Sequence, residues 1–345
     1  MAEAKTASPT AELEKLMVTR RGAEPLGVAL PADEFLHAPA PSGHFSATET
    51  SYYGFNIPDA KLNGEIYIWF HPVLKVMSAS VYIWKGLKDS SLACEYVNHY
   101  HYLPYPDSDI DDYEIPLIGL KIKVIHPLEE VRVLFEDVTR NVSFDLTLRA
   151  IMPAAVRPGG FHFTQACKTT GELNLYGEKL KIDGYFSRDR SWSQERRETS
   201  MHLPPVSWMV GVVDETFAFH FVGFDSEGVD PEVTKRYPMG ASNLMWGYIF
   251  RDGVTVPLVS GRKLTKRAED GISPDLFELE LTDADGEIHL IKGSVEARMP
   301  WQTWQNMNVY FCLTRWETAR GIGWGDTQDI QYNDFVHRFG PHTRG

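Results

Sequence analysis

The densest run of polar side chains within a strand-like part of the sequence is Asp183–Trp192, which reads DGYFSRDRSW. It places one carboxylate, Asp189, between two guanidiniums, Arg188 and Arg190. Because side chains alternate between the faces of a strand, Asp189 is expected on the face opposite both arginines. A carboxyl there can act as an acid or a base. The alternative is a structural ion-pair network, and guanidiniums aimed at Asp189 would lower its pKa and favour a base or structural role.

Two further residues can take part in acid or base chemistry near this segment. Tyr185 lies in the same predicted strand and can donate a hydrogen bond to a substrate oxygen, with ordinary packing as the alternative. His220 alternates with aromatic residues in Phe217–Phe221. It is either a satisfied core histidine or a proton shuttle that faces a cavity.

Aromatic side chains provide the walls that such chemistry needs. The chain contains nine tryptophans, and an aromatic face attracts a developing carbocation through cation–π interaction. We select Trp192, Trp208, Trp246 and Trp304 as candidate substrate-binding residues, with Arg188 as a polar contact. Packing in a core is the alternative for each tryptophan.

Metal and cofactor motifs are weak by comparison. His99 and His101 share a strand face, as metal ligands in β-proteins often do, but the sequence offers no second cluster at ligand spacing. No Gly-x-Ser-x-Gly elbow, Walker sequence or dinucleotide fingerprint stands between a strand and a helix. We therefore expect neither a metal nor a cofactor, and we interpret the glycine-rich run Gly321–Gly325 as a place where strands approach closely.

The segment GYFSRDRSW resembles the G-x-G-x-R-D-H-S-W-G signature of the hydroxyneurosporene synthase (carotenoid 1,2-hydratase) family. YYGFNIPDAKLNGEIYIWF and ETARGIGWGDTQDIQYND extend the resemblance over residues 48–338. Phe186, Arg190 and Ser193 depart from the signature. The resemblance implies two fused lipocalin-like barrels, a hydrophobic isoprenoid-like ligand, and Asp189 as a proton donor or base near the site.

The elements that must position these residues are strands. From Thr48 onward, β-branched and aromatic residues alternate with polar ones in short runs separated by turn signals such as Asn63-Gly64 and Asp252-Gly253. With 345 residues, two units are expected rather than one. We predict an all-β protein with an extended lead-in over 1–45 and tandem lipocalin-like barrels over 46–170 and 171–345.

Composition excludes several classes of partner. The chain has 34 Lys and Arg against 47 Asp and Glu, a formal net charge of −13, so it lacks the positive charge that nucleic-acid binding requires. Its apolar runs are the length of strands, shorter than a membrane span. Three separated cysteines and no visible targeting segment favour a reducing, cytoplasmic location. The expected partner is a small hydrophobic molecule, and the oligomeric state is left open.

These observations lead to one functional hypothesis and two alternatives. The hypothesis is a cofactor-independent lyase, either a hydratase, a dehydratase or a double-bond isomerase, that acts on a hydrophobic terpenoid, steroid or aromatic substrate in an aromatic-lined cavity. One alternative is a binding protein that holds an apolar ligand without chemistry. The other is a cyclase whose cavity acts as a template.

Overall fold

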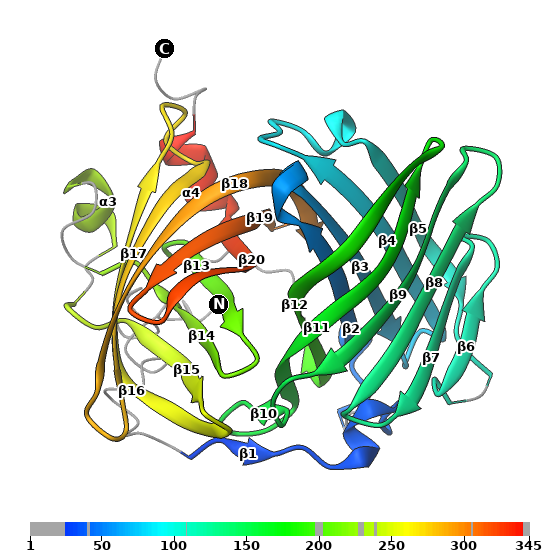
Figure 1. Ribbon diagram of the computed structural model, residues 1–345, viewed down its shortest axis with the longest axis horizontal. Helices are drawn as coiled ribbons and strands as arrows, with labels where there is room; N and C mark the ends of the chain where they lie inside the picture. Colours follow the sequence, from blue (N-terminus) through cyan, green and yellow to red (C-terminus); the bar gives the residue numbers. More distant parts are fainter. Residues whose placement is uncertain are drawn as a thin grey trace, which may run out of the picture.

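The computed structural model describes residues 25–39, 42–107, 109–196, 203–226, 231–237, 240–304 and 306–340. A curled sheet from the first half of the chain stands beside a closed barrel from the second half (Figure 1). The predicted all-β fold with two lipocalin-like units is confirmed, and the first unit is an open sheet. The short helical segments are η1 (Pro31–Glu34), η2 (Pro58–Ala60), η3 (Ser91–Ala93), α3 (Pro231–Arg236) and α4 (Asn333–Phe339).

The first sheet contains twelve strands in the order β5-β4-β3-β2-β12-β11-β9-β8-β7-β6, with β10 joining β1 to β11. The strands are β1 (Gly27–Val28), β2 (Ala47–Ile57), β3 (Leu62–His71), β4 (Val76–Lys85), β5 (Tyr96–Pro104), β6 (Asp112–Ile115), β7 (Leu120–His126), β8 (Glu130–Asp137), β9 (Val142–Ala150), β10 (Ala155–Val156), β11 (His162–Leu175) and β12 (Glu178–Glu195). The pairing of β2 with β12 joins two sets of consecutive hairpins into one sheet.

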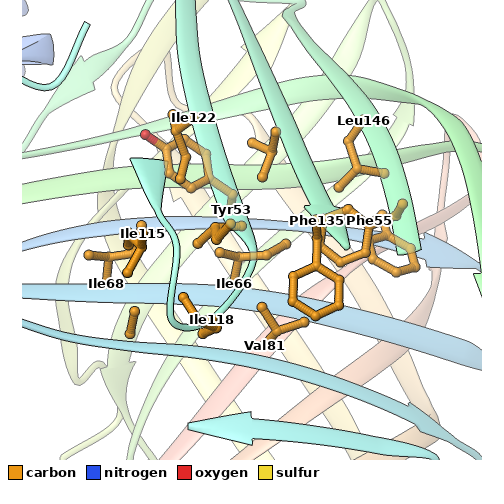
Figure 2. Close-up of a cluster of buried hydrophobic side chains, with 14 of the residues drawn as sticks. Tyr53, Phe55, Ile66, Ile68, Val81, Ile115, Ile118, Ile122, Phe135 and Leu146 are labelled. Carbon is orange, nitrogen blue, oxygen red and sulfur yellow. The ribbon is translucent and has the colours of Figure 1, made fainter. Parts of the chain in front are cut away.

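The sheet curls around a core of aliphatic and aromatic side chains. Ile66 and Val81 from β3 and β4 meet Phe135 and Leu146 from β8 and β9 (Figure 2). These side chains come from alternate positions of their strands, as the period of two predicts. Each contributes roughly 1.5–3 kcal/mol by leaving water, so the interior of this unit is filled by its own core.

The closed barrel contains eight strands, each paired with its neighbours in the sequence, and β13 pairs with β20 to close it. The strands are β13 (Val206–Asp214), β14 (Phe217–Phe224), β15 (Leu244–Arg251), β16 (Val254–Arg267), β17 (Pro274–Asp283), β18 (Ile288–Trp304), β19 (Met307–Thr318) and β20 (Gly321–Tyr332). The expected close approach at the glycine-rich run is confirmed, because a Cβ on Gly325 would lie 1.8 Å from the Val210 carbonyl oxygen.

Large side chains occupy the interior of the barrel. Trp316 is fully buried there and contacts Phe219 edge-on, with their ring centroids 5.0 Å apart. Gly293 makes room for this indole, because a Cβ at that position would lie 2.3 Å from the Trp316 ring. The middle of the barrel is therefore packed core, which directs the search for a site to the outer surface of the barrel.

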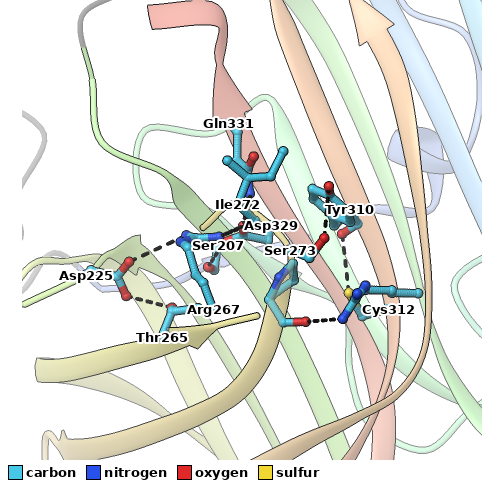
Figure 3. A network of polar contacts seen from close by, with 12 residues as sticks. Ser207, Asp225, Thr265, Arg267, Ile272, Ser273, Tyr310, Cys312, Asp329 and Gln331 are labelled. Atoms are coloured by element: carbon cyan, nitrogen blue, oxygen red, sulfur yellow. Dashed lines mark hydrogen bonds and ion pairs between the residues drawn. The ribbon is translucent and has the colours of Figure 1, made fainter. Parts of the chain in front are cut away.

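One end of the barrel interior is polar (Figure 3). Arg267 Nη1 donates to Asp329 Oδ2 at 2.7 Å, and Thr265 Oγ1 donates to Asp225 Oδ1 at 2.6 Å. The fully buried Lys263 ammonium lies 3.0 Å from Asp225 Oδ1. Burial raises the pKa of Asp329, but the charges of Arg267 and Lys263 and the hydrogen bonds outweigh it, so the pKa is lowered. This network of paired charges is a structural feature of the barrel.

The strand that carries the DGYFSRDRSW segment belongs to the first sheet. β12 pairs with β11 from Glu178 to Ser191 and with β2 from Asp189 to Glu195. The sheet therefore extends to Glu195, past the expected change of unit at residues 170 and 171, and the barrel begins at Val206. The difference arises because the turn at Tyr176-Gly177 makes β11 and β12 one hairpin of the same sheet.

The described part of the lead-in packs on this sheet. β1 pairs with β10, and Glu34 at the end of η1 accepts two hydrogen bonds from the Arg188 guanidinium, at 2.5 and 2.9 Å. Burial raises the pKa of Glu34, but the charge and hydrogen bonds of Arg188 outweigh it and lower the pKa. Residues before β2 thus supply a buried charge that the first sheet requires.

The three cysteines are free thiols, with Cys167 and Cys312 buried and Cys94 half-buried. None of the helices in the described segments has both the length and the apolar character needed to cross a bilayer.

Candidate active site

The outer face of the first sheet packs against the outer face of the barrel through a shared aromatic cluster. Strands β2, β3, β4 and β12 meet β18 and β19 there. Tyr82 and Trp69 both contact Trp301 across the interface, with centroid distances of 4.8 and 5.2 Å. Tyr52 similarly contacts Phe311 at 6.4 Å. Because both interiors are filled, this interface is where the predicted site residues can meet.

Asp189 points toward the interface, and the neighbouring arginines point away from it. Arg188 binds Glu34 and also donates to Gln165 Oε1 at 2.9 Å. Arg190 donates to Ser51 Oγ at 2.7 Å and lies 3.2 Å from Glu49 Oε2. The alternation expected from the sequence is thus present, and both guanidiniums bond to groups other than Asp189.

The pKa of Asp189 is raised to about 7, mainly because the side chain is removed from water. The charge of Asp326 raises it further, while Arg196 and Arg190 act in the opposite direction. In the sheet, Asp189 stands between Thr164 of β11 and Tyr52 of β2. A carboxyl with a pKa near neutrality can hold and release a proton at physiological pH, as a general acid must.

A second carboxyl approaches from the barrel. Asp326 on β20 is 3% exposed and accepts a hydrogen bond from Tyr52 Oη at 3.0 Å and from Gln328 Nε2 at 3.3 Å. Burial raises its pKa to about 7, although both hydrogen bonds favour the ionised form. Its Oδ1 atom is buried with no hydrogen-bond partner among the described residues. Asp326 therefore brings a second group that titrates near neutrality to the same interface.

A third carboxyl, Glu65 on β3, is fully buried, and neither of its oxygens has a hydrogen-bond partner within the described chain. Burial and then the charge of Asp326 raise its pKa well above the ordinary value. We call Glu65, Asp189 and Asp326 the carboxyl cluster. Burial raises the pKa of all three carboxyls, and the charge of Asp326 raises the pKa of the other two further, so the cluster holds protons at neutral pH.

Two tyrosines cover the cluster. The rings of Tyr52 and Tyr67 meet edge to face with centroids 5.2 Å apart. Burial raises the pKa of both hydroxyls, and nearby carboxylates, including Glu65 and Asp189, raise them further. Both phenols therefore keep their protons and can donate hydrogen bonds beside the carboxyl cluster.

A second group of predicted residues meets farther along the interface. His220 lies 4.5 Å from Trp246 and 5.5 Å from Trp208 by ring centroids. His162 from β11 contacts Trp208 at 4.9 Å, and Tyr248 contacts His220 at 5.3 Å. His162 is itself held by Ser191 and Thr164 at 2.8 and 2.9 Å. The structure thus brings three predicted residues, Trp208, His220 and Trp246, together with His162.

The protonation state of His220 follows from its surroundings. Burial lowers the pKa to about 3, so the ring is neutral at physiological pH. Nδ1 lies 2.9 Å from the Met209 carbonyl oxygen, which can only accept, so Nδ1 carries the proton. Nε2 is then an acceptor that is buried without a partner among the described residues. His220 therefore has one ring nitrogen in a hydrogen bond, as a core histidine would, and one buried nitrogen that can still accept a hydrogen bond from a ligand.

The remaining predicted residues lie elsewhere. Tyr185 is at the edge of the interface, where the Lys168 ammonium sits 4.4 Å from its ring centroid. Trp192 stacks on His37 of the lead-in at 4.4 Å, away from Trp208 and Trp246. Arg188 lies on the core side of the sheet with Glu34. Trp304 is at the end of β18, and its side chain is outside the described part of the structure.

Sequence reasoning missed the residues that accompany Asp189. Tyr52 and Tyr67 were visible as alternate positions of predicted strands, and Asp326 directly follows the Gly321–Gly325 run. Arg196 follows β12, and its charge lowers the pKa values of His71 and His162 as well as acting on Asp189. These residues are far apart in the sequence, so only the packing of the barrel on the sheet reveals them as one site.

Within the described segments, His99 and His101 do not form a group of three potential metal ligands with mutually close ligand atoms. Among the described residues, the one cluster whose potential ligand atoms lie within 4.8 Å of one another is Asp283, Glu287 and His289. That cluster already surrounds the Arg251 guanidinium, which bonds to Asp283 and lies 2.8 Å from Glu287 Oε2. The carboxylates of Asp283 and Glu287 are therefore already paired with the Arg251 guanidinium.

Comparisons with known proteins agree with the fold. The crystal structure of kievitone hydratase from Nectria haematococca superposes with a TM-score of 0.53 at 15% identity, covering 89% of this chain and 94% of that chain. The crystal structure of CghA gives a TM-score of 0.53 at 13% identity, covering 87% and 94%. A search of curated proteins found no match. At these identities the likeness establishes a shared fold, and the resemblance to hydroxyneurosporene synthase stays a prediction.

A family model matches residues 30–331, a range that contains the whole carboxyl cluster and the His220 group. The chain is thus a member of the family described as Domain of unknown function (DUF7064).

Proposed function

We propose that this protein is a cofactor-independent hydro-lyase that adds water to, or removes water from, an uncharged hydrophobic terpenoid, steroid or aromatic substrate at the interface of sheet and barrel. The observation that carries the proposal is the pairing of Asp189 and Asp326, two carboxyls with pKa values of about 7 on facing elements. The fold shared with kievitone hydratase, named as a hydratase, supports it.

The pair divides into an acid and a base. Tyr52 and Gln328 donate hydrogen bonds to Asp326, which stabilises its ionised form. Asp189 feels the charge of Asp326, which stabilises its protonated form. At neutral pH the two groups can therefore hold one proton between them, with Asp189 as the general acid and Asp326 as the general base.

Hydration then needs only the alkene, a water molecule and the two carboxyls. The Asp189 proton forms a C–H bond with the electron pair of the alkene, which leaves a carbocation on the neighbouring carbon. Aromatic faces such as those of Tyr52 and Tyr67 stabilise the cation. A water oxygen forms the C–O bond and passes its proton to Asp326. Dehydration follows the same steps in reverse, and the atoms balance as alkene plus water giving alcohol.

The His220 group has a different role in this proposal. With a pKa of about 3, His220 is too weak a base to carry a proton at neutral pH. Its Nε2 lone pair can instead accept a hydrogen bond from a substrate hydroxyl or from water, between the indoles of Trp208 and Trp246. His220 therefore acts as a positioning residue.

The test is turnover in heavy-oxygen water. Wild-type protein is incubated with terpenoid, steroid and aromatic alkenes, and alcohols that contain the label are detected by mass spectrometry. Asp189→Asn is expected to lower the rate by about 10²–10⁴-fold. The matched control is Asp183→Asn, because Asp183 lies on the same strand but is exposed and paired with Lys168 and Lys181.

Two outcomes would reject the proposal. Unchanged turnover in Asp189→Asn would remove this carboxyl from the chemistry. Binding of the alkenes by wild-type protein without any labelled product would favour a binding protein instead.

A further inference from the structure

A pocket of about 420 Å³ opens at the interface between β3, β4, β5 and the end of β18. We call it the histidine pocket and define it by six of the residues that line it, Trp69, His71, Ser78, His99, His101 and Thr303. Among the described residues that line it, none carries a carboxylate, an ammonium or a guanidinium. In a chain with 81 charged Lys, Arg, Asp and Glu residues (34 + 47), an uncharged lining indicates an uncharged ligand.

A β-bulge shapes one wall of the pocket. The register of β4 and β5 shifts between Met77 and Ala79, so that two residues of β5, His101 and Tyr102, stand opposite Ser78. Tyr102 has a positive φ of 56°. Bulges re-aim side chains and occur often beside functional sites. Here the bulge leaves His101 Nδ1 3.3 Å from Ser78 Oγ, and the His101 ring 4.3 Å from that of His99.

Burial lowers the pKa of two imidazoles in the pocket, His99 and His71, so both rings are neutral at physiological pH. Burial lowers the pKa of His99 to about 4, and the charge of His101 lowers it further. Burial also lowers the pKa of His71, together with the charges of His101 and Arg196. A neutral imidazole offers one N–H donor and one lone pair, which suits a hydroxyl group better than an anion.

Polar atoms in the wall lack partners. His99 Nε2 and Thr303 Oγ1 are screened from solvent and have no hydrogen-bond partner among the described residues. A buried polar atom without a partner is costly, so a ligand that supplies one gains affinity. Beside them, the Trp69 ring lies near-parallel to His99 at 5.8 Å and Trp301 meets His99 edge-on at 5.2 Å. Of these two rings, Trp69 lines the pocket and provides an apolar face next to the hydrogen-bonding groups.

A chain of aromatic contacts links the wall of the pocket to the carboxyl cluster. Trp69 lies 4.3 Å from Tyr67, which contacts Tyr52, whose hydroxyl donates to Asp326. Arg196 acts on His71 in the pocket and on Asp189 in the cluster, so it lies near both. The pocket is therefore next to the side chains that surround the two carboxyls.

From this geometry we infer that the histidine pocket binds an uncharged phenol ring, with the ring against Trp69 and its hydroxyl among the imidazole and hydroxyl groups of His99, Ser78 and Thr303. The extension of the inference to catalysis, in which the phenol is one end of a substrate whose alkene or alcohol reaches Asp189, rests on the proposed function. Phenol binding itself does not.

The test is calorimetric titration of the full-length protein with 2-naphthol, and with naphthalene-2-carboxylate as the charged analogue of similar shape. Wild-type protein is expected to bind 2-naphthol at least tenfold more tightly than the carboxylate. His99→Phe is expected to weaken 2-naphthol binding by about tenfold or more, which is the loss of one hydrogen bond to a buried group. The matched control is His126→Phe, which changes an exposed histidine on β7.

The outcomes separate this inference from the proposed function. Asp189→Asn is expected to bind 2-naphthol as tightly as wild type, so turnover can be lost while the pocket is intact. If His99→Phe does not fold, Ser78→Ala supplies the same test with a smaller change. The inference is overturned if wild type does not bind 2-naphthol, if the carboxylate binds as tightly, or if the pocket variant that folds binds like His126→Phe.

Discussion

Asp326 and Asp329 lie three residues apart on β20, are 3% and 0% exposed, and have opposite electrostatic surroundings. Asp329 points into the barrel, where Arg267 and Lys263 lower its pKa (Figure 3). Asp326 points toward the first sheet, where its partners are a phenol and an amide and its pKa rises to about 7. Burial alone therefore does not identify a functional carboxylate, because a neighbouring cation decides whether the buried group is fixed as an ion or can titrate.

The contrast between Asp326 and Asp329 is expected to have its largest effect on the free energy of unfolding. Asp329→Asn leaves the buried Arg267 without its closest carboxylate and is expected to lower the free energy of unfolding by about 3–5 kcal/mol. Asp326→Asn replaces a group that is already partly protonated at pH 7, so a change within about 1 kcal/mol is expected. Urea unfolding of both variants measures the difference, and equal losses would contradict the contrast.

Asp326 and Asp329 are also expected to change the stability in opposite directions as the pH rises. Asp326 has a higher pKa in the folded than in the unfolded protein, so between about pH 4 and 7 the folded state binds more protons and stability falls as the pH rises. Asp329 has a lower pKa when folded, so its contribution is present above about pH 4 and is lost as the pH falls through its folded pKa. One such proton changes the free energy of unfolding by up to about 1.4 kcal/mol per pH unit.

Unfolding curves from pH 3 to 8 check this. Asp326→Asn is expected to flatten the decline between pH 4 and 7, and Asp329→Asn to flatten the loss in acid. If both substitutions changed the stability in the same pH range, the pKa values of Asp326 and Asp329 would not be shifted in opposite directions.

Tyr52→Phe tests how far the hydrogen bond from Tyr52 determines the pKa of Asp326. It removes the hydroxyl that donates to Asp326, so the pKa of Asp326 is expected to rise and the free energy of unfolding to fall by about 1 kcal/mol. Carbon NMR of labelled aspartate carboxyls follows the titration. Tyr113→Phe is the control, because Tyr113 is buried in the first sheet and its hydroxyl has no partner among the described residues. An unmoved Asp326 titration in Tyr52→Phe would exclude the bond as a determinant of its pKa.

The smallest effect is expected for the exposed carboxylate on the motif strand. Lys168 and Lys181 lower the pKa of Asp183 to about 2, but solvent screens these pairs. Thermal unfolding of Asp183→Asn is expected to match wild type, with less than about 0.5 kcal/mol lost. A larger loss would show that exposed pairs on this strand resemble the buried ones.

Local alternation in the sequence was enough to predict that the fold consists of strands and that Asp189 lies on one face of its strand. It could also place Arg188 and Arg190 on the opposite face, because that depends only on the period of a strand. It could not show that Glu34 and Glu49 neutralise them, since those partners come from segments about 140 to 155 residues earlier.

The candidate site was predictable only in part for the same reason. Trp208, His220 and Trp246 lie on three consecutive strands. The sequence predicts the two tryptophans as lining residues and His220 as a separate candidate, without predicting their contact. Trp192 was grouped with the two tryptophans because it was assigned to the second unit, whereas β12 completes the first sheet. The contact between Tyr52 and Asp326 joins residues 274 positions apart and has no local signal.

The bond between Glu34 and Arg188 also bears on how much of the chain is needed to fold. A protein trimmed to start at β2, as a lead-in over 1–45 would suggest, would retain a guanidinium that is 2% exposed but would lack its carboxylate. The residues from β1 to η1 are therefore part of the folding unit. Cleavage by a protease between η1 and β2 would break the covalent link between this counter-charge and the sheet that holds Arg188.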